Sequence, residues 1–399
     1  MRVTQSMLFQ GSVSGLQSKY QQLKRVQNET VSGNAINRPM DDPAGMFRQI
    51  IFSSDLKGVN SIVRNSDVAN TRLRTGEEKI GLIHEYFLEA QDISIQLGND
   101  YQADPVTLNS VSLKANALYK EVLTAANASL NGSPIFGGGR SAVPFDESTP
   151  SATTIERRAT GTDIHAGFVS QSDLSVQANS LDSSHADYPG LPKSVRLVYQ
   201  QASDDFVVSV NGTTDPASPV ANAATLDLGW VKLDVAGAAT FTDKDSYYFE
   251  VVPTYQGGSQ DREIKVADDK TFPGNVAGDE LIEGRNSRGV NLFGILTGLE
   301  GALKRGDTTE IAAMLRKIQD GRDQVADQQA VSGLRVAHVE TVTLTMQGDA
   351  DVISESMAKN TEVDIFDAIT RMEQTTQSLQ MMTITERNIL NTSLIDFIR

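Results

Sequence analysis

Residues 59–97 read VNSIVRNSDVANTRLRTGEEKIGLIHEYFLEAQDISIQL and carry an unbroken heptad pattern. Twelve positions, separated by alternating steps of three and four residues, align on one side of a helix, and nine of them are apolar. They are Val59, Ile62, Ser66, Ala69, Leu73, Gly76, Ile80, Ile83, Phe87, Ala90, Ser94 and Leu97. A seam of this length is typical of a long, coiled-coil-like helix, so the sequence predicts a helical rod that Asn99 and Pro105 end.

The same spacing recurs on both sides of this stretch. A third run follows at residues 108–125 and stops at the turn residues 131–134, and no proline occurs after Pro273. Both chain ends carry a similar apolar stripe, so we expect a packing helix at each end. The residues assigned to these stripes and to the end of the last helix are Val13, Leu16, Tyr20, Leu23, Ile365, Met372, Leu379, Met382, Ile389, Leu394 and Phe397.

The two chain ends have opposite charge. Residues 1–40 hold five basic side chains and one acidic one, whereas residues 350–399 hold eight acidic and four basic ones. Opposed charge beside matched apolar stripes favours pairing of the terminal helices, either with each other or with those of a neighbouring molecule. The alternative is that both faces are solvated and never meet.

A proline-rich loop separates the first predicted helix from the second. In the segment 37–43, NRPMDDP, Asp42 is well placed to cap the second helix, and Pro43 suits its first position. The adjacent carboxylates could instead form an acid–base pair, but no nucleophile or histidine lies near them in the sequence. The residues assigned to this capping loop are Asn37, Arg38, Pro39, Asp41, Asp42 and Pro43.

The middle of the chain has a different character. Of the 24 aromatic residues, 12 lie between Phe145 and Phe272. Alternating apolar runs at 194–199 and 206–210 predict a hairpin, and residues 246–252 predict a strand closed by Pro253. The chain is therefore predicted to be mainly α, a long coiled-coil-like bundle formed by both ends, with an inserted β-rich (α+β) central domain.

Composition disfavours several functions. The 399 residues carry a formal net charge of −16, which opposes binding to nucleic acid or to an anionic membrane. There is no cysteine, there are only four histidines, and no stretch resembles a membrane span or a secretory signal peptide. The glycine run 137–139 before Arg140 lacks the spacing of a phosphate-binding loop. We therefore expect neither enzymatic activity nor a cofactor or metal site.

At this point the chain resembles the flagellin family, and within it the branch of hook-associated junction proteins. The segments that carry the resemblance are 31–39 (VSGNAINRP), 41–45 (DDPAG), 131–138 (NGSPIFGG), 257–264 (GGSQDREI), 278–280 (GDE), 362–364 (EVD) and 393–398 (SLIDFI), together with the opening MRVT. Two places depart from the usual family pattern. Val31, Ser32 and Gly33 stand where serine, threonine and glycine are more usual, and Met40 stands where a serine is common. Neither departure disturbs the capping argument.

The resemblance implies an assembly role outside the cell. Residues 1–42 and 359–399 would form an inner tube, 43–140 and 290–358 a helical rod around it, and 141–289 a variable outer domain. The implied partners are further copies in a helical ring, the preceding hook-associated protein, and flagellin on the filament side. Flagellar type III export, without a cleaved signal peptide and assisted by an export chaperone, would deliver the chain.

Two alternatives stay open from the sequence. The chain could be a filament flagellin, against which the opening MRVT and the segment 257–280 argue. It could also be a surface adhesin whose central domain stacks sugars on aromatic rings, although packing in a small β core is the favoured role for such rings. The rings considered are Tyr199, Trp230, Tyr247, Tyr248 and Tyr255.

Overall fold

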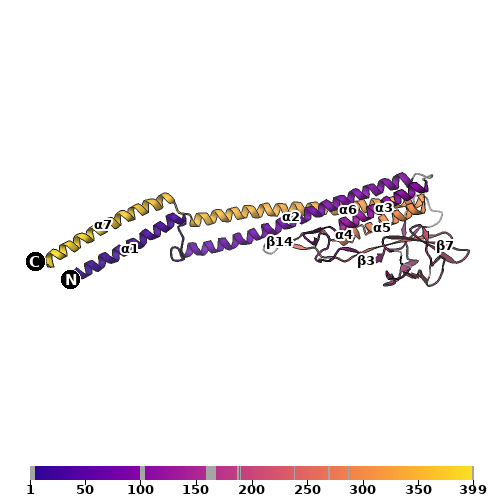
Figure 1. Cartoon of the computed structure of the whole chain (residues 1–399), viewed down its shortest axis with the longest axis horizontal. Coiled ribbons are helices and arrows are strands. Elements are labelled where there is room, and N and C mark those ends of the chain that lie inside the picture. The colour runs from indigo at the N-terminus through magenta and orange to yellow at the C-terminus, as the bar shows by residue number, and fades with distance from the viewer. Residues whose placement is uncertain are drawn as a thin grey trace. The chain divides into compact units, whose positions relative to one another are not determined.

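The computed structural model describes residues 5–98, 104–158, 168–186, 188, 190–237, 239–267, 270–285 and 287–397. The chain forms two compact units, the first from residues 1–64 and 343–399 and the second from residues 65–342. Helices at both ends and a β-rich centre (Figure 1) confirm the predicted fold class. The division of the chain by assembly role, with its bounds at 42, 140, 289 and 358, stays a prediction.

Long helices follow the predicted heptad runs. Residues 59–97 lie within one uninterrupted helix, and the expected breaks near Pro105 and at 131–134 are present. Among the described residues, every helix is too polar or too short to be a candidate transmembrane span. The helices are α1 (Gln5–Ser32), α2 (Pro43–Gly98), α3 (Pro105–Ala126), α4 (Gly278–Ile282), α5 (Leu292–Arg305), α6 (Thr308–Thr361) and α7 (Ile365–Phe397).

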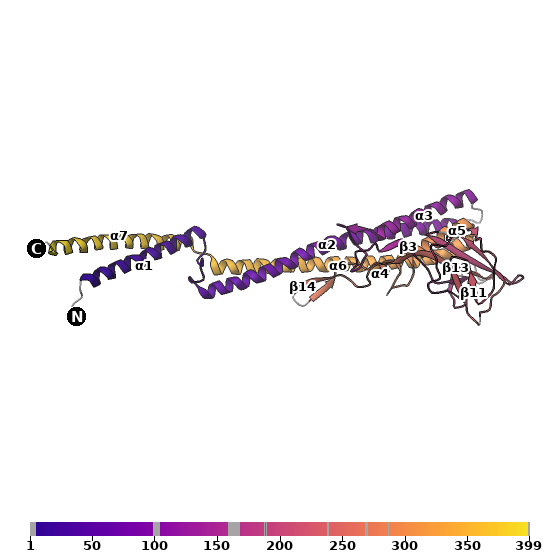
Figure 2. The same cartoon turned by 60° about the horizontal axis from the view of Figure 1, so that its bottom comes forward.

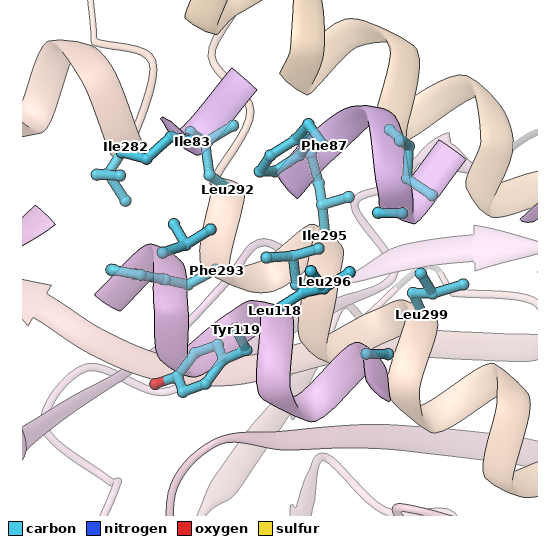
Figure 3. Close-up of a cluster of buried hydrophobic side chains, with 14 of the residues drawn as sticks. Ile83, Phe87, Leu118, Tyr119, Ile282, Leu292, Phe293, Ile295, Leu296 and Leu299 are labelled. Carbon is cyan, nitrogen blue, oxygen red and sulfur yellow. The ribbon is translucent and has the colours of Figure 1, made fainter. Parts of the chain in front are cut away.

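The helical core of the second unit lies among α2, α3, α5 and α6. The heptad residues Ile80, Ile83 and Phe87 are fully buried there, as Figure 3 shows for two of them. Phe293 of α5 packs edge-on against Tyr119 of α3, with ring centroids 5.5 Å apart. The apolar stripe of α2 is therefore buried within the chain itself along this part of its length.

The close approach of α2 and α5 to α6 depends on Gly321 of α6. A methyl group added there would lie 2.7 Å from the Phe87 side chain and 2.8 Å from that of Ile295, so a larger residue would collide with both. Gly333 on the same helix has no such neighbour, because an added methyl would meet only the Glu77 side chain at 3.6 Å.

Strands occupy the region between α3 and α4. They are β1 (Ser129–Leu130), β2 (Ser133–Pro134), β3 (Phe145–Ala152), β4 (Glu156–Arg158), β5 (Val169–Ser170), β6 (Leu174–Val176), β7 (Lys193–Gln200), β8 (Asp205–Val210), β9 (Thr213–Thr214), β10 (Val220–Ala221), β11 (Thr225–Asp227), β12 (Lys232–Val235), β13 (Ser246–Tyr255), β14 (Glu263–Ala267) and β15 (Lys270–Pro273). Over the described residues, the largest sheet has eight strands, with the order β10-β8-β7-β13-β4-β5, β3 paired to β13 and β9 to β8. A separate sheet has the order β11-β12-β6.

The β-rich part has its own apolar core. Phe206, Trp230, Tyr247 and Phe249 are fully buried in it. The predicted hairpin is confirmed, since β7 and β8 pair antiparallel with Tyr199 opposite Phe206. Strand β13 contributes to both cores, because Val251 lies in the β core whereas Val252 lies in the helical one.

The expected end of a strand at Pro253 is wrong. Strand β13 continues to Tyr255, with a register shift against β3 between Pro253 and Thr254. Its pairing with β7 ends at Val251, so Pro253 has β3 as a paired neighbour but no longer has β7. A proline without a ladder N–H is tolerated where a bulge interrupts the register.

The start and the end of the β-rich region contact each other. Gly258 donates its N–H to the Gly137 carbonyl at 3.0 Å, and the Tyr255 hydroxyl donates to the Phe136 carbonyl at 2.8 Å. Gly138 has a positive φ of 59°, and a methyl group there would collide with the Gly258 backbone. The glycine run 137–139 thus allows two backbone segments to approach closely.

The two glycines of α6 provide a matched test of this packing. We expect Gly321→Ala to lower the free energy of unfolding by about 1–3 kcal/mol, because the new methyl overpacks the core. Gly333→Ala should raise it by about 0.5–1 kcal/mol, because alanine suits a helix interior better than glycine. Urea unfolding followed by fluorescence of Trp230, the single tryptophan, measures both changes. Equal effects at the two sites would contradict the packing described here.

Candidate functional site

The two terminal helices pair with each other. Helices α1 and α7 lie side by side (Figures 1 and 2), and their shared face buries Val26, Ala368 and Thr375. A methyl group added at Gly15 of α1 would lie 3.2 Å from the Met382 side chain, so the helices remain close along this length. Of the two arrangements that the opposed charges favour, pairing within one molecule is thus the one present in this structure.

An ion pair accompanies the apolar contact. Glu29 of α1 is 5% exposed, and its carboxylate lies 3.2 Å from Arg25 on the same helix and 3.3 Å from Arg371 on α7. The acid is thus on the otherwise basic helix and the base on the otherwise acidic one. Sequence analysis missed both roles, because net charge alone does not show which single side chains face the partner.

The residues assigned to the terminal stripes are only partly covered. Val13, Leu16, Leu23, Met372 and Leu379 are half-buried. Tyr20, Ile365 and Met382 are exposed, with 67%, 52% and 36% of their surface accessible. Ile389, Leu394 and Phe397 lie outside the residues whose side chains the structure describes. Within the single chain, then, part of the predicted stripe has no covering partner.

The exposure of Tyr20 has a geometric reason. The covered positions Leu16, Lys19, Leu23 and Val26 follow steps of three and four residues, so the covered face of α1 runs through Lys19 and leaves Tyr20 to one side. Because Lys19 is polar, a count of apolar positions alone did not show this register.

Other large apolar side chains on these two helices are also exposed. Phe366 is 85% exposed and Val31 is 89% exposed. Met381 and Ile384 of α7 are 68% and 56% exposed. A cavity of about 230 Å³, lined by Ser12, Met381, Met382, Thr385 and Glu386, shows that α1 and α7 do not close completely upon each other. Exposed apolar surface of this extent is typical of a surface that another protein covers.

Local capping builds the loop between α1 and α2. Gly33 ends α1 with a φ of 70°, and its N–H bonds to the Glu29 carbonyl at 2.9 Å. Pro39 follows Arg38 in a turn that the Asp41 N–H closes on the Arg38 carbonyl at 2.9 Å.

Both aspartates of the loop accept backbone hydrogen bonds. Asp41 accepts from the N–H groups of Asn37 and Arg38, at 3.3 and 2.9 Å. Asp42 accepts from the Ala44 N–H at 3.1 Å, directly before the first helical residue Pro43. The two carboxylates therefore hold the backbone of the loop and the first turn of α2.

The loop is also tied to the end of α6 and to the link that leads into α7. Ala35 donates its N–H to the Thr361 carbonyl at 2.7 Å, and Val363 donates to the Gly33 carbonyl at 3.1 Å. The Asn360 amide donates to the Gly45 carbonyl at 2.9 Å. These bonds fix where α7 begins relative to α1, so the loop positions the helix pair.

The residues considered for other chemistry have structural surroundings. Trp230, Tyr247 and Tyr248 are buried in the fold, Tyr199 is 7% exposed and Tyr255 is only half-exposed. The idea that these rings form an exposed sugar-stacking platform is therefore wrong, because their faces are used in packing. Within the part of the chain that the structure describes, no cluster of three or more potential metal ligands is found.

The first part of the chain is similar in sequence to known proteins. Residues 5–140 match the family model of the bacterial flagellin N-terminal helical region. Polar flagellin F of Vibrio parahaemolyticus is 25% identical over 227 residues, which are 53% of this chain and 60% of the relative. The chain thus matches about 60% of the length of this curated relative.

The chain is also similar to solved structures. Flagellar hook-associated protein 3 of Legionella pneumophila is 16% identical, with 77% of this chain and 98% of that chain covered and a TM-score of 0.38. A putative flagellar hook-associated protein of Vibrio parahaemolyticus is 11% identical, with 81% and 100% covered and a TM-score of 0.49. At these TM-scores neither likeness bears on the function of this chain.

The loop geometry predicts a strong effect at Gly45. A methyl group there would lie 2.4 Å from both the Asp42 carboxylate and the Ile36 side chain. We expect Gly45→Ala to displace the cap and to speed amide hydrogen exchange in residues 33–47 by roughly tenfold, which corresponds to about 1.4 kcal/mol of local stability. Exchange measured by mass spectrometry tests this.

The control for that measurement is Gly58→Ala, on the same helix, where an added methyl meets no atom within 4 Å. It should leave exchange in the loop unchanged. Equal protection of the loop in Gly45→Ala and in the parent protein would show that the cap does not hold it.

Proposed function

We propose that this protein is a structural subunit of the bacterial flagellum, the hook-associated protein 3 that joins the hook to the filament. The observation that carries the proposal is a flagellin-family terminal helix paired with the carboxyl-terminal helix, while large apolar side chains on both stay exposed. Such a pair is suited to further association, because neighbouring copies can bury what the single chain leaves in water.

The assembly follows from the type of contact. A contact between two different faces of identical subunits repeats from copy to copy and generates a ring or a helical tube. Residues 1–42 and 359–399 would line the inside of this tube, with 43–140 and 290–358 around them and 141–289 outermost. The neighbours along the axis would be the preceding hook-associated protein on one side and flagellin on the other.

The place of action would be the flagellum outside the cell. The chain would leave through the flagellar type III export channel with the help of a chaperone and without a cleaved signal peptide. No enzymatic activity is proposed, because a subunit of this kind acts by holding its neighbours.

A filament flagellin is the second candidate. The family match of residues 5–140 and the curated polar flagellin relative support a filament flagellin as well as they support the junction protein. The segment 257–264 and the residues 278–280 favour the junction protein, since they resemble the stretch by which junction proteins leave their outer domain.

Immunogold labelling of intact flagella separates the two candidates. A label confined to a narrow band just beyond the hook is the result expected for the junction protein. A label along the whole filament would identify a flagellin instead. Absence of label from flagella that contain all other axial proteins would contradict both.

The stripe on α7 predicts a loss of assembly. Replacing both Leu379 and Met382 by aspartate should abolish incorporation into flagella, because assembly would then bury unpaired charges. The fluorescence of Trp230 should stay unchanged, since this residue belongs to the second unit. Incorporation is measured by electron microscopy of flagella and by immunoblotting of sheared flagella.

The matched control replaces Gln377 and Gln380 by aspartate. These residues have the same spacing on α7, are exposed, and would receive the same added charge. Normal incorporation of this control together with loss in the Leu379 and Met382 variant supports the packing stripe. Normal junctions in both variants would refute it.

A further inference from the structure

A cavity of about 550 Å³ lies in the second unit between helix α2, the short β1–β2 hairpin and strand β14. The hairpin of β14 and β15 packs beside α2 and α6 (Figures 1 and 2), where Ile264 and Phe272 contact the cluster of Ala69, Leu73, Val336 and Val339. One wall of the cavity is apolar, formed by Val68, Leu130 and Ile264. The volume lies in the range of pockets that bind small organic molecules.

Arg72 of α2 is a buried positive charge that lines this cavity. The residue is only 8% exposed, yet its guanidinium contacts neutral acceptors: the Ser133 hydroxyl at 3.2 Å, the Ile135 carbonyl at 3.3 Å and the Pro134 carbonyl. Its Nε is buried without a hydrogen-bond partner. Within the described part of the chain, no carboxylate forms an ion pair with it. A buried charge without a counter-charge is costly, so the site favours an anion.

A second arginine faces the same space. Arg262, directly before β14, is exposed, lines the cavity and has no ion pair among the described residues. Burial and the nearby charge of Arg262 both lower the pKa of Arg72, with burial the larger cause. Lys265 also lines the cavity, whereas Glu263 is the acid in its lining. The cavity is therefore positively charged in a chain whose net charge is −16.

We propose that this cavity binds a carboxylate with an apolar body, the carboxylate lying between Arg72 and Arg262 and the body against Val68, Leu130 and Ile264. Arg262 would offer its planar guanidinium fork, which matches the geometry of a carboxylate, and Arg72 would offer the N–H of its unpartnered Nε. The apolar wall favours a short hydrocarbon chain over a bare inorganic anion. This site does not depend on the flagellar role proposed above.

Isothermal titration of the full chain with hexanoate tests the proposal, with sodium chloride used to hold the ionic strength constant. Acetate has the same carboxylate without the longer hydrocarbon chain, and 1-hexanol has the hydrocarbon chain without the charge. Hexanoate should bind more tightly than either. No heat above that of the chloride control, or equal binding of hexanoate and hexanol, would overturn the site.

The decisive variant is Arg262→Gln, because Arg262 is exposed whereas Arg72 also holds the β1–β2 hairpin. It should weaken hexanoate binding about tenfold, as expected for loss of one charge-assisted hydrogen bond. The control is Arg316→Gln, which removes an equal charge from an exposed position on α6, about 30 Å along the helix from Val336. Equal weakening in both variants would show nonspecific attraction and would reject the site.

The carboxylate could come from a free organic acid or from an acidic side chain of a second copy of this chain. Sedimentation velocity with and without saturating hexanoate distinguishes the sources. If a second copy supplies the carboxylate, hexanoate should reduce self-association of the parent protein. The Arg262→Gln variant should then show the same reduced self-association in the absence of hexanoate. Unchanged sedimentation, together with hexanoate binding, assigns the site to a free acid.

Discussion

Helices α2, α5 and α6 approach each other closely at Gly321, and the second unit is organised around this contact. A side chain at this position would occupy the space that Phe87 and Ile295 fill, and Leu292 lies just beyond them. Because α2 and α5 both reach the α6 backbone there, the heptad stripe of α2 finds a continuous apolar partner. Strand β13 extends the same core into the β-rich part through Val252.

The first unit follows a different principle. Its terminal helices α1 and α7 share a narrow buried face at Val26, Ala368 and Thr375, and Glu29 is held between Arg25 and Arg371. Because the Arg25 and Arg371 side chains are 53% and 43% exposed, water screens both ion pairs, and they contribute little to stability. The remaining apolar surface is left to other molecules, in keeping with the proposed role of this unit in assembly.

The predictions that differ from the structure all concern where a residue lies relative to its packing partners. A heptad count placed Tyr20 and Ile365 in the packing stripe, but the covered face of α1 runs through Lys19 and leaves Tyr20 exposed. Ile365 is the first residue of α7, directly after Asp364, whose side chain accepts the Phe366 N–H at 2.9 Å. Pro253 does not end its strand, since the adjacent strand β7 is no longer paired there. In each case the position of the residue in its helix or sheet, and not the residue type, decides the outcome.

Local sequence was sufficient for the helices, their breaks and the loop before α2, because heptad spacing and capping act over a few residues. Asp42 and Pro43 stand beside the helix they begin, and the alternating runs of β7 and β8 are joined by a short turn. The cavity beside Arg72 could not be foreseen in this way. Its walls come from segments near residues 68, 130 and 264, which only the folded chain brings together. Whether a charge is buried, and whether an acid lies near enough to balance it, depends on those distant segments. For that reason only the tertiary structure determined this cavity and the buried charge of Arg72.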